Sequence, residues 1–475
     1  MPQLARTLGE LKASGYPDRT VKDELRDNLI DRLSEGRDLF SGIIGFEESV
    51  VPTLEKAILA GHDVILLGER GQAKSRLIRS LVALLDEAVP AIEGCEVNDH
   101  PFHPICRACR TLTAERGEAT PLTWIGRDHR FSEKLATPDT SVGDLIGDVD
   151  PIRVAEGHYL SDELTIHYGL VPRTNRGIFA VNELPDLPER IQVGLLNILE
   201  ERDVQVRGYK IRLPLDLMLI ASANPEDYTH RGRIISPLKD RFGTQVRTHY
   251  PVRSDDEIAI MDQEASRVPS QVPVRVPRYV KEILAEFTAL LRASGQVNQR
   301  SGVSVRFSIG NLETVSAGAL RRAVRTGEAE AVARIVDLWG VLPASTGRIE
   351  FDALEEGREE EILARAMRKA IMAVWQRRLS GENFDRLAAR FDEGLTIETS
   401  DLMPSSRLLA QFEADGPIES LVGIQRLVGR LDLIEESPAS AASAVEMCLE
   451  GLYLNRRVSK HEDALPGRYR YGAGD

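Results

Sequence analysis

The sequence lacks several features that would mark a membrane-bound or secreted protein. No apolar run approaches the roughly 18 residues that a membrane-spanning helix needs, and residues 1–12 lack the apolar block of a signal peptide. Only four of the 475 residues are cysteines, and three of these are clustered. That usage fits a reducing compartment better than a disulfide scaffold. We therefore expect a cytoplasmic protein with no membrane segment.

The chain also has fewer basic residues than acidic residues. The chain carries 60 Lys and Arg residues against 74 Asp and Glu residues, which gives a formal net charge of -14. This excess disfavours nucleic acid or an anionic membrane as the main partner, although a locally basic surface is compatible with it. The sequence shows no internal repeat, no low-complexity tract and no recognisable helix-turn-helix pattern. Its length predicts two to four domains.

The most informative stretch is a glycine turn between an apolar run and a helical pattern. Residues 64–67 predict a buried parallel strand, and apolar residues at helical spacing in 77–84 predict the helix. The turn and the start of the helix comprise Gly68, Glu69, Arg70, Gly71, Gln72, Ala73, Lys74, Ser75 and Arg76. Its glycines let backbone N–H groups converge on a phosphate, Lys74 can reach the terminal phosphates of a nucleotide, and Ser75 can ligate Mg²⁺. The flanking strand and helix disfavour the alternative of a chance glycine turn.

One position of this turn departs from the usual pattern. Ala73 stands where such loops commonly have glycine. Because alanine is the smallest possible replacement, we expect nucleotide binding to survive.

Two later apolar runs end in polar residues, as strands do where they open onto a site. The run that starts at Arg176 ends in Asn182 and Glu183, and the run 217–223 is followed by Asn224. Glu183 can orient and deprotonate an attacking water, Asn182 can hold the hydration shell of Mg²⁺, and Asn224 can bond the γ-phosphate or the water. Strands of this kind usually have Asp where this chain has Asn182, so we expect slow turnover of the nucleotide. A carboxylate near a helix N-cap is the alternative interpretation of Glu183.

A cysteine-rich segment lies between these motifs. Cys106 and Cys109 form a Cys-x-x-Cys pair, with Cys95 and His103 upstream. Such a pair places two thiolates on one tetrahedral metal ion, so the segment predicts a structural zinc site. The pattern leaves four possibilities for the fourth ligand: His100, His103, Asp99 or no residue at all. We include His103 in the predicted ligand set. A metal-free loop with buried cysteines and a redox site are the alternatives.

In this order, the motifs resemble those of the AAA+ ATPases of the magnesium chelatase ATPase subunit and MoxR-like group. The resemblance spans residues 40–330 and rests on four ordered stretches. These are the glycine turn 68–75, which corresponds to the P-loop of that group, and the stretches 175–183, 221–228 and 239–243. Residues 136–147 and 157–169 look like the insertion before the Walker B strand of that group, and 199–208 look like its hairpin before the sensor strand. The cysteine-rich segment is not part of the shared core.

The resemblance implies a role for each matching residue. Lys74 and Ser75 are Walker A residues, and Asn182 and Glu183 are the Walker B pair. Asn224 corresponds to sensor 1, and Arg241 corresponds to the arginine finger, which acts on a neighbour's nucleotide. Arg306 corresponds to the sensor 2 arginine, and the triplet Ile43, Ile44 and Gly45 corresponds to the loop beside the adenine.

The implied architecture is an α/β AAA+ P-loop NTPase core with a parallel five-stranded sheet flanked by helices. The predicted parts are an N-terminal helical arm (1–38), the nucleotide-binding domain (39–252) with a cysteine-rich insertion (93–125), a helical lid (253–342) and a helical C-terminal domain (343–475).

The implied function is that of an ATP hydrolase that uses ATP and Mg²⁺ in a homo-oligomeric ring, expected to be a hexamer. It would remodel a protein partner or assist metal insertion, alongside a partner with a von Willebrand factor A domain. One alternative is an ATP-binding switch with little hydrolysis, which Asn182 motivates. Another is a transcriptional or DNA-remodelling motor, which the acidic charge and the absence of the Gly-Ala-Phe-Thr-Gly-Ala loop of such activators disfavour.

Overall fold

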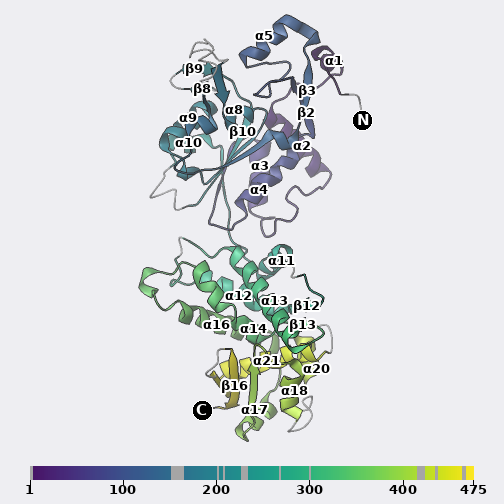
Figure 1. The fold of residues 1–475 in the computed structure, drawn as a ribbon, viewed down its shortest axis with the longest axis vertical. Coiled ribbons are helices and arrows are strands. Elements are labelled where there is room, and N and C mark those ends of the chain that lie inside the picture. Colours follow the sequence, from purple (N-terminus) through teal and green to yellow (C-terminus); the bar gives the residue numbers. More distant parts are fainter. Residues whose placement is uncertain are drawn as a thin grey trace. The chain divides into compact units, whose positions relative to one another are not determined.

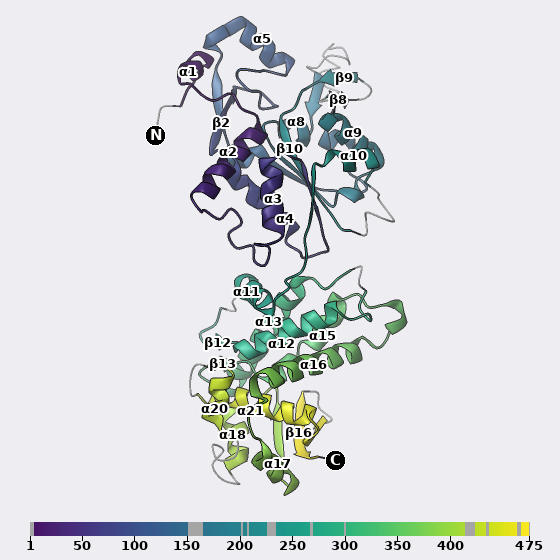
Figure 2. The ribbon, with the colours of Figure 1, turned by 180° about the vertical axis from the view of Figure 1, so that it is seen from behind.

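The computed structural model describes residues 4–150, 165–200, 203–206, 209–225, 234–266, 269–298, 301–413, 423–433, 437–462 and 467–474. The chain forms two compact units, here called unit 1 (Met1–His249) and unit 2 (Tyr250–Asp475). Figures 1 and 2 show the helices and strands of each unit from opposite sides. The predicted four-part division is finer than these two units and stays a prediction.

Unit 1 is built on a five-stranded sheet with strand order β11-β1-β10-β7-β4. Each pairing between neighbouring strands is parallel. Strands β1 and β10 are buried at every position, as the apolar run of β1 and the mostly apolar run of β10 predict. The strands are β1 (Val64–Leu67), β4 (Phe131–Leu135), β7 (Gly177–Asn182), β10 (Leu217–Ala223) and β11 (Thr244–Arg247). The predicted fold class is confirmed.

Helices pack on both faces of this sheet. Alternate residues of β1, β7 and β10 point into two separate hydrophobic cores, one shared with α2, α3 and α4 and the other with α9 and α10. These helices are α2 (Val21–Ser34), α3 (Val50–Leu59), α4 (Lys74–Ser80) with the 3-10 turn η1 (Leu81–Leu84), α9 (Glu189–Glu200) and α10 (Ser236–Arg241). The helix predicted after the P-loop is therefore present, and its last turn is 3-10.

A buried ion pair ties α2 to the sheet. Arg130 Nη2 lies 2.6 Å from Glu24 Oε2, and the two side chains are 1% and 5% exposed. Arg130 also donates to the carbonyl oxygen of Arg176 beside β7. Removing one partner of such a pair would leave the other charge buried and unpaired. The pair therefore holds α2 in place against the sheet. Within the predicted N-terminal arm, α2 thus packs as part of the sheet-bearing unit.

In the described part of unit 1, three two-stranded antiparallel pairs lie outside the central sheet. Strands β2 (Ala88–Ile92) and β3 (Leu122–Gly126) enclose the cysteine-rich segment, which contains α5 (Arg107–Arg116) and η2 (Gly117–Ala119). Strand β5 (Gly147–Val149) pairs with β6 (Ile166–Tyr168), and β8 (Asp203–Val206) pairs with β9 (Tyr209–Arg212). The last pair is the hairpin predicted before the sensor strand, while residues 157–164 of the predicted insertion lie outside the described residues. Short helices complete the unit: α1 (Leu8–Ala13), η3 (Arg127–Arg130), α6 (Val142–Leu145), α8 (Leu170–Arg173) and η5 (Leu184–Asp186).

Unit 2 is mainly helical and has one continuous hydrophobic core. The apolar stripe predicted on the helix α16 is buried in that core, from Leu363 to Trp375. The helices are α11 (Ser254–Glu264), α12 (Arg278–Arg292), α13 (Val305–Thr326), α14 (Ile335–Trp339), α15 (Leu342–Ser345), η6 (Thr346–Arg348), η7 (Ala353–Glu355), α16 (Glu359–Leu379), α17 (Asp385–Asp392), α18 (Ser405–Glu413), α20 (Ile424–Arg430) and α21 (Pro438–Leu454).

Unit 2 also contains strands that the helical prediction omitted. Strands β12 (Val274–Arg275) and β13 (Ala331–Val332) pair in parallel, and β14 (Ile397–Ser400), β16 (Arg468–Ala473) and β15 (Val458–Glu462) form an antiparallel sheet in that order. These strands are short, and β14 pairs with a strand far away in the sequence, so local periodicity did not identify them. Among the described residues, none of the helices combines the length and the apolar composition that a membrane crossing requires.

Candidate nucleotide site

The backbone of the P-loop follows β1 and turns sharply into α4. Ala73 immediately precedes α4 and has φ 52° and ψ 16°, in the left-handed region. That conformation costs a residue with a Cβ roughly 1–2 kcal/mol, whereas glycine adopts it without this penalty. The geometry explains why glycine is the usual residue there, and alanine is tolerated at a modest cost.

Gly68 lets the P-loop pack closely against Thr248, the residue that follows β11. A Cβ at this position would collide with Thr248 Oγ1 and Gln72 Oε1. Thr248 Oγ1 donates a hydrogen bond of 2.7 Å to Gln72 Oε1, and Gln72 Oε1 also accepts from the backbone N–H of Glu69 at 3.1 Å. Thr248 therefore fixes the loop, although nothing in the sequence singled it out.

Three motifs that are far apart in the sequence meet at the carboxyl ends of the strands. Lys74 Nζ donates to Asn224 Oδ1 at 2.9 Å, and Asn224 Nδ2 donates to Glu183 Oε2 at 3.1 Å. Lys74 is 7% exposed and also donates to the carbonyl oxygens of Gly68 and Glu69. The structure thus brings the P-loop lysine, the predicted base and the predicted sensor into one hydrogen-bonded group.

Glu183 holds a strained backbone conformation in this group. Its φ of 54° lies in the left-handed region, which non-glycine residues rarely occupy. Such outliers concentrate at functional sites, where the surrounding structure holds them in place. The strain aims the carboxylate from the end of β7 toward Asn224.

A second row of hydrogen bonds crosses the sheet on its α4 side. Ser222 Oγ donates to Asn182 Oδ1 at 3.1 Å, and Asn182 Nδ2 donates to Glu133 Oε1 on the adjacent strand β4. Arg79 of α4 completes the row, because its Nε lies 2.7 Å from Glu133 Oε2. A carboxylate therefore contacts Asn182 directly. Sequence reasoning missed Glu133, since only the register of β4 against β7 brings it there.

The other predicted nucleotide-site residues lie as follows. Residues 40–45 form the expected turn, in which Ile43 is buried and Gly45 has a φ of 84°. Ser75 is half-buried at the start of α4, and Arg70 and Arg76 are exposed.

The two predicted arginines of the wider site lie in different units. Arg241 at the end of α10 is 51% exposed and pairs with Glu200. Arg306, in the first turn of α13, is exposed and belongs to unit 2.

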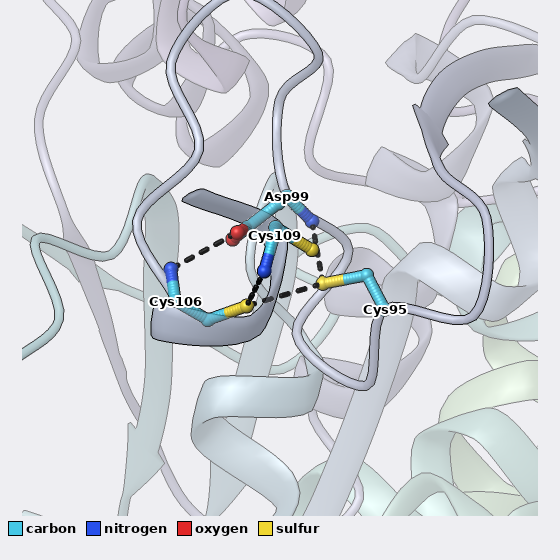
Figure 3. A group of neighbouring side chains, drawn as sticks. All are labelled: Cys95, Asp99, Cys106 and Cys109. Carbon is cyan, nitrogen blue, oxygen red and sulfur yellow. Dashed lines mark hydrogen bonds between the residues drawn. The ribbon is translucent and has the colours of Figure 1, made fainter. Parts of the chain in front are cut away.

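The predicted zinc ligands are only partly brought together. The candidate ligand atoms of Cys95, Cys106 and Cys109 lie within 4.8 Å of one another, with a carboxylate oxygen of Asp99 as the fourth member (Figure 3). His103 lies outside the group: its side chain is 67% exposed, and its Nε2 lies 2.7 Å from Asp18 Oδ2. Asp99 therefore replaces His103 as the fourth candidate. Burial, as the main cause, raises the pKa of Asp99 to about 8.

Comparisons with known proteins follow the same motifs. Residues 155–241 match the family described as the Sigma-54 interaction domain. The chain is 32% identical over 220 residues to the magnesium-chelatase 38 kDa subunit of Cereibacter sphaeroides, covering 45% of this chain and 59% of that protein. It is 31% identical over 215 residues to the subunit of the same name from Rhodobacter capsulatus, covering 45% of this chain and 56% of that protein. The chain thus spans less than two thirds of the length of these relatives.

Solved structures give weaker likeness. A structure of the complex between subunits BchI and BchD of magnesium chelatase matches with a TM-score of 0.35 and 21% identity, over 68% of this chain and 98% of that chain. NtrX from Brucella abortus matches with a TM-score of 0.39 and 14% identity, over 76% of this chain and 69% of that chain. The sequence matches confirm the predicted resemblance to AAA+ ATPases of the magnesium chelatase group.

Proposed function

From this resemblance to magnesium chelatase ATPase subunits, we propose that the chain is a ring-forming AAA+ ATPase that couples ATP hydrolysis to the remodelling of a protein partner or to metal insertion. The observation that carries the proposal is the hydrogen-bonded group of Lys74, Asn224 and Glu183. In it, Lys74 holds the β- and γ-phosphates, Asn224 positions the γ-phosphate and the water, and Glu183 accepts the proton of that water.

The P-loop and its neighbours fit ATP with Mg²⁺ as cofactor. The loop amides and Lys74 suit the phosphates, and the Ser75 hydroxyl would bind the metal ion. Mg²⁺ would neutralise charge that develops on the phosphate oxygens. Zinc, the other metal expected from the sequence, has no part in this chemistry, because the cysteine cluster lies beside α5 at the opposite end of unit 1 from α4 (Figures 1 and 2).

Lys74→Ala is expected to weaken ATP binding by roughly 10- to 100-fold, which is the range for loss of one charge-assisted contact. The measurement is equilibrium binding of a fluorescent ATP analogue to the full chain. Lys12→Ala removes a lysine that is 52% exposed and serves as the matched control. Equal affinity in the Lys74→Ala variant and the wild type would refute the assignment of the nucleotide site.

The absence of Asp at position 182 need not prevent hydrolysis, because Glu133 contacts Asn182. We propose that Glu133 supplies the carboxylate charge that the hydration shell of Mg²⁺ requires. Three features support this role: Glu133 lies on the α4 side of the sheet, its side chain is 17% exposed, and Arg79 orients it from α4. With it, the chain is an ATPase rather than a nucleotide switch without turnover.

Glu133→Gln is accordingly expected to lower ATP turnover by about 10- to 100-fold, the usual effect of losing an outer-shell group of a metal site. Asn182→Asp in the same chain should restore most of the loss, because the carboxylate returns at the usual position. Glu87→Gln, the same substitution at a carboxylate whose side chain is 96% exposed, is the control and should leave turnover unchanged. Full activity of the Glu133→Gln variant would contradict the proposal that Glu133 supplies the charge missing at position 182.

The ring, its hexameric size and the partner with a von Willebrand factor A domain rest on the resemblance. The exposed position of Arg241 supports a role at a subunit interface, because an arginine finger must reach a neighbour's nucleotide. Cytoplasmic location is part of the proposal, and the four free thiols of the chain support it.

The match to the Sigma-54 interaction domain spans the predicted base and Arg241. It supports the ATPase chemistry of that stretch. A transcriptional role is not favoured, because the Gly-Ala-Phe-Thr-Gly-Ala loop is missing from the sequence.

A further inference from the structure

The segment between β2 and α5 gathers three thiols and a carboxylate around one point. Cys95 Sγ and Cys106 Sγ lie 4.0 Å apart, and the candidate ligand atoms of all four side chains lie within 4.8 Å of one another. Two thiolates on one tetrahedral zinc ion, with Zn–S bonds of about 2.3 Å, would lie roughly 3.8 Å apart. The observed separation fits this arrangement. It is about twice the length of a disulfide bond, which is about 2.05 Å.

Asp99 is the member of the group that most needs a cation. Its Oδ2 accepts hydrogen bonds from the backbone N–H groups of Ile105 at 3.1 Å and Cys106 at 2.9 Å. Its Oδ1 is buried and has no hydrogen-bond partner. An unpartnered buried carboxylate oxygen is costly, whereas a metal-bound oxygen is satisfied. Figure 3 shows the carboxylate beside the three thiols.

Backbone amides also support the sulfur atoms. The N–H of Asp99 donates to Cys95 Sγ, and the N–H of Cys109 donates to Cys106 Sγ, both at 3.3 Å. Hydrogen bonds to sulfur favour the thiolate, which is the form that binds metals. The group is thus oriented by the backbone, as the outer shell of a metal site orders its ligands.

We propose that Cys95, Asp99, Cys106 and Cys109 bind one structural zinc ion. Four protein ligands fill a tetrahedron, so no position stays open for a substrate or a catalytic water. The ion would fasten the segment 93–105, which contains no helix or named strand, to the first turn of α5. Metal binding would then contribute directly to the folding of the enclosed segment between β2 and β3.

The nearby histidines are matched controls for this ligand set. His103 is bonded to Asp18, and His100 lies outside the group although it is adjacent to Asp99 in the sequence. If the carboxylate is the fourth ligand, removing either imidazole should leave the metal in place.

The first test measures the metal in the wild-type full chain. Protein produced with added zinc and purified without chelators should contain one zinc ion per chain by elemental analysis. Replacement of zinc by Co²⁺ should give the visible absorption of tetrahedral cobalt together with thiolate-to-cobalt charge-transfer bands. A wild-type chain that binds neither metal, or whose mass shows a disulfide among the three cysteines, would overturn the proposal without any variant.

The second test identifies the fourth ligand. Asp99→Ala should weaken zinc affinity by more than the roughly 10- to 100-fold that loss of an outer-shell partner causes. Asp99→Cys should retain the ion, and His103→Ala and His100→Ala should match the wild type. Each variant is checked for folding by circular dichroism and by ATP binding, which the cluster does not serve. Loss of zinc in His103→Ala with full retention in Asp99→Ala would refute this ligand set, and Asp99→Cys distinguishes loss of a ligand from failure to fold.

Discussion

Replacing Glu183 with Gln is expected to lower ATP turnover by about 100- to 1,000-fold while ATP still binds, because a general base contributes on this scale. The amide keeps the shape and the hydrogen bond to Asn224 but cannot accept the proton of the attacking water. The measurement is steady-state phosphate release, with binding of an ATP analogue measured on the same preparation. Unchanged turnover in this variant would remove Glu183 from the chemistry.

The control for this experiment is Glu189→Gln, the same substitution at an exposed position of α9. It should leave turnover near the wild-type rate. If both substitutions reduced hydrolysis equally, the loss would reflect a general change in charge or fold and not the removal of a base.

Arg241→Ala is expected to lower turnover by about 1,000-fold, the lower end of the range for an arginine finger. The guanidinium would stabilise the charge on the transferred phosphoryl group of the neighbouring subunit. Its present ion pair with Glu200 is exposed and worth little, so stability should change only slightly. Phosphate release and oligomer size are measured together, with Lys239→Ala on the same helix as control.

An Arg241→Ala variant that forms the wild-type oligomer and hydrolyses ATP at the wild-type rate would contradict the role of this residue. A variant that fails to assemble would instead indicate that Arg241 holds the interface. The size measurement separates these two results.

The P-loop and the ends of β7 and β10 could be predicted because their constraints are local. A buried parallel strand reads as an unbroken apolar run, and the phosphate turn needs small residues followed by Lys74 at fixed spacing. Glu183 and Asn224 were recognisable as polar residues at the ends of such runs, and the structure brings both to Lys74.

Contacts that depend on register could not be predicted in the same way. Glu133 reaches Asn182 only because β4 pairs with β7, and Thr248 reaches the P-loop only because β11 lies beside β1. Asp99 was one of several open candidates for the fourth zinc ligand. The fold of the segment, not the Cys-x-x-Cys spacing, buries it among the thiols and leaves His103 outside.

The strands of unit 2 show the same limit in the fold. Strand β16 alternates polar and aromatic residues only over Arg468–Tyr471, and it pairs with both β15, which is close in the sequence, and β14, which lies far away. Strands this short leave little periodic signal, so the helical prediction for this region was incomplete.

The central claim is that each ATPase site is completed by a neighbouring subunit, and mixing two inactive variants tests it most directly. In a mixed ring, a subunit with Arg241→Ala still carries Glu183, and a neighbour with Glu183→Gln still supplies Arg241. The account predicts that the mixture hydrolyses ATP well above the sum of the two variants measured alone, and increasingly so at higher protein concentration. A mixture no more active than that sum, from variants that each assemble and bind ATP, would contradict it.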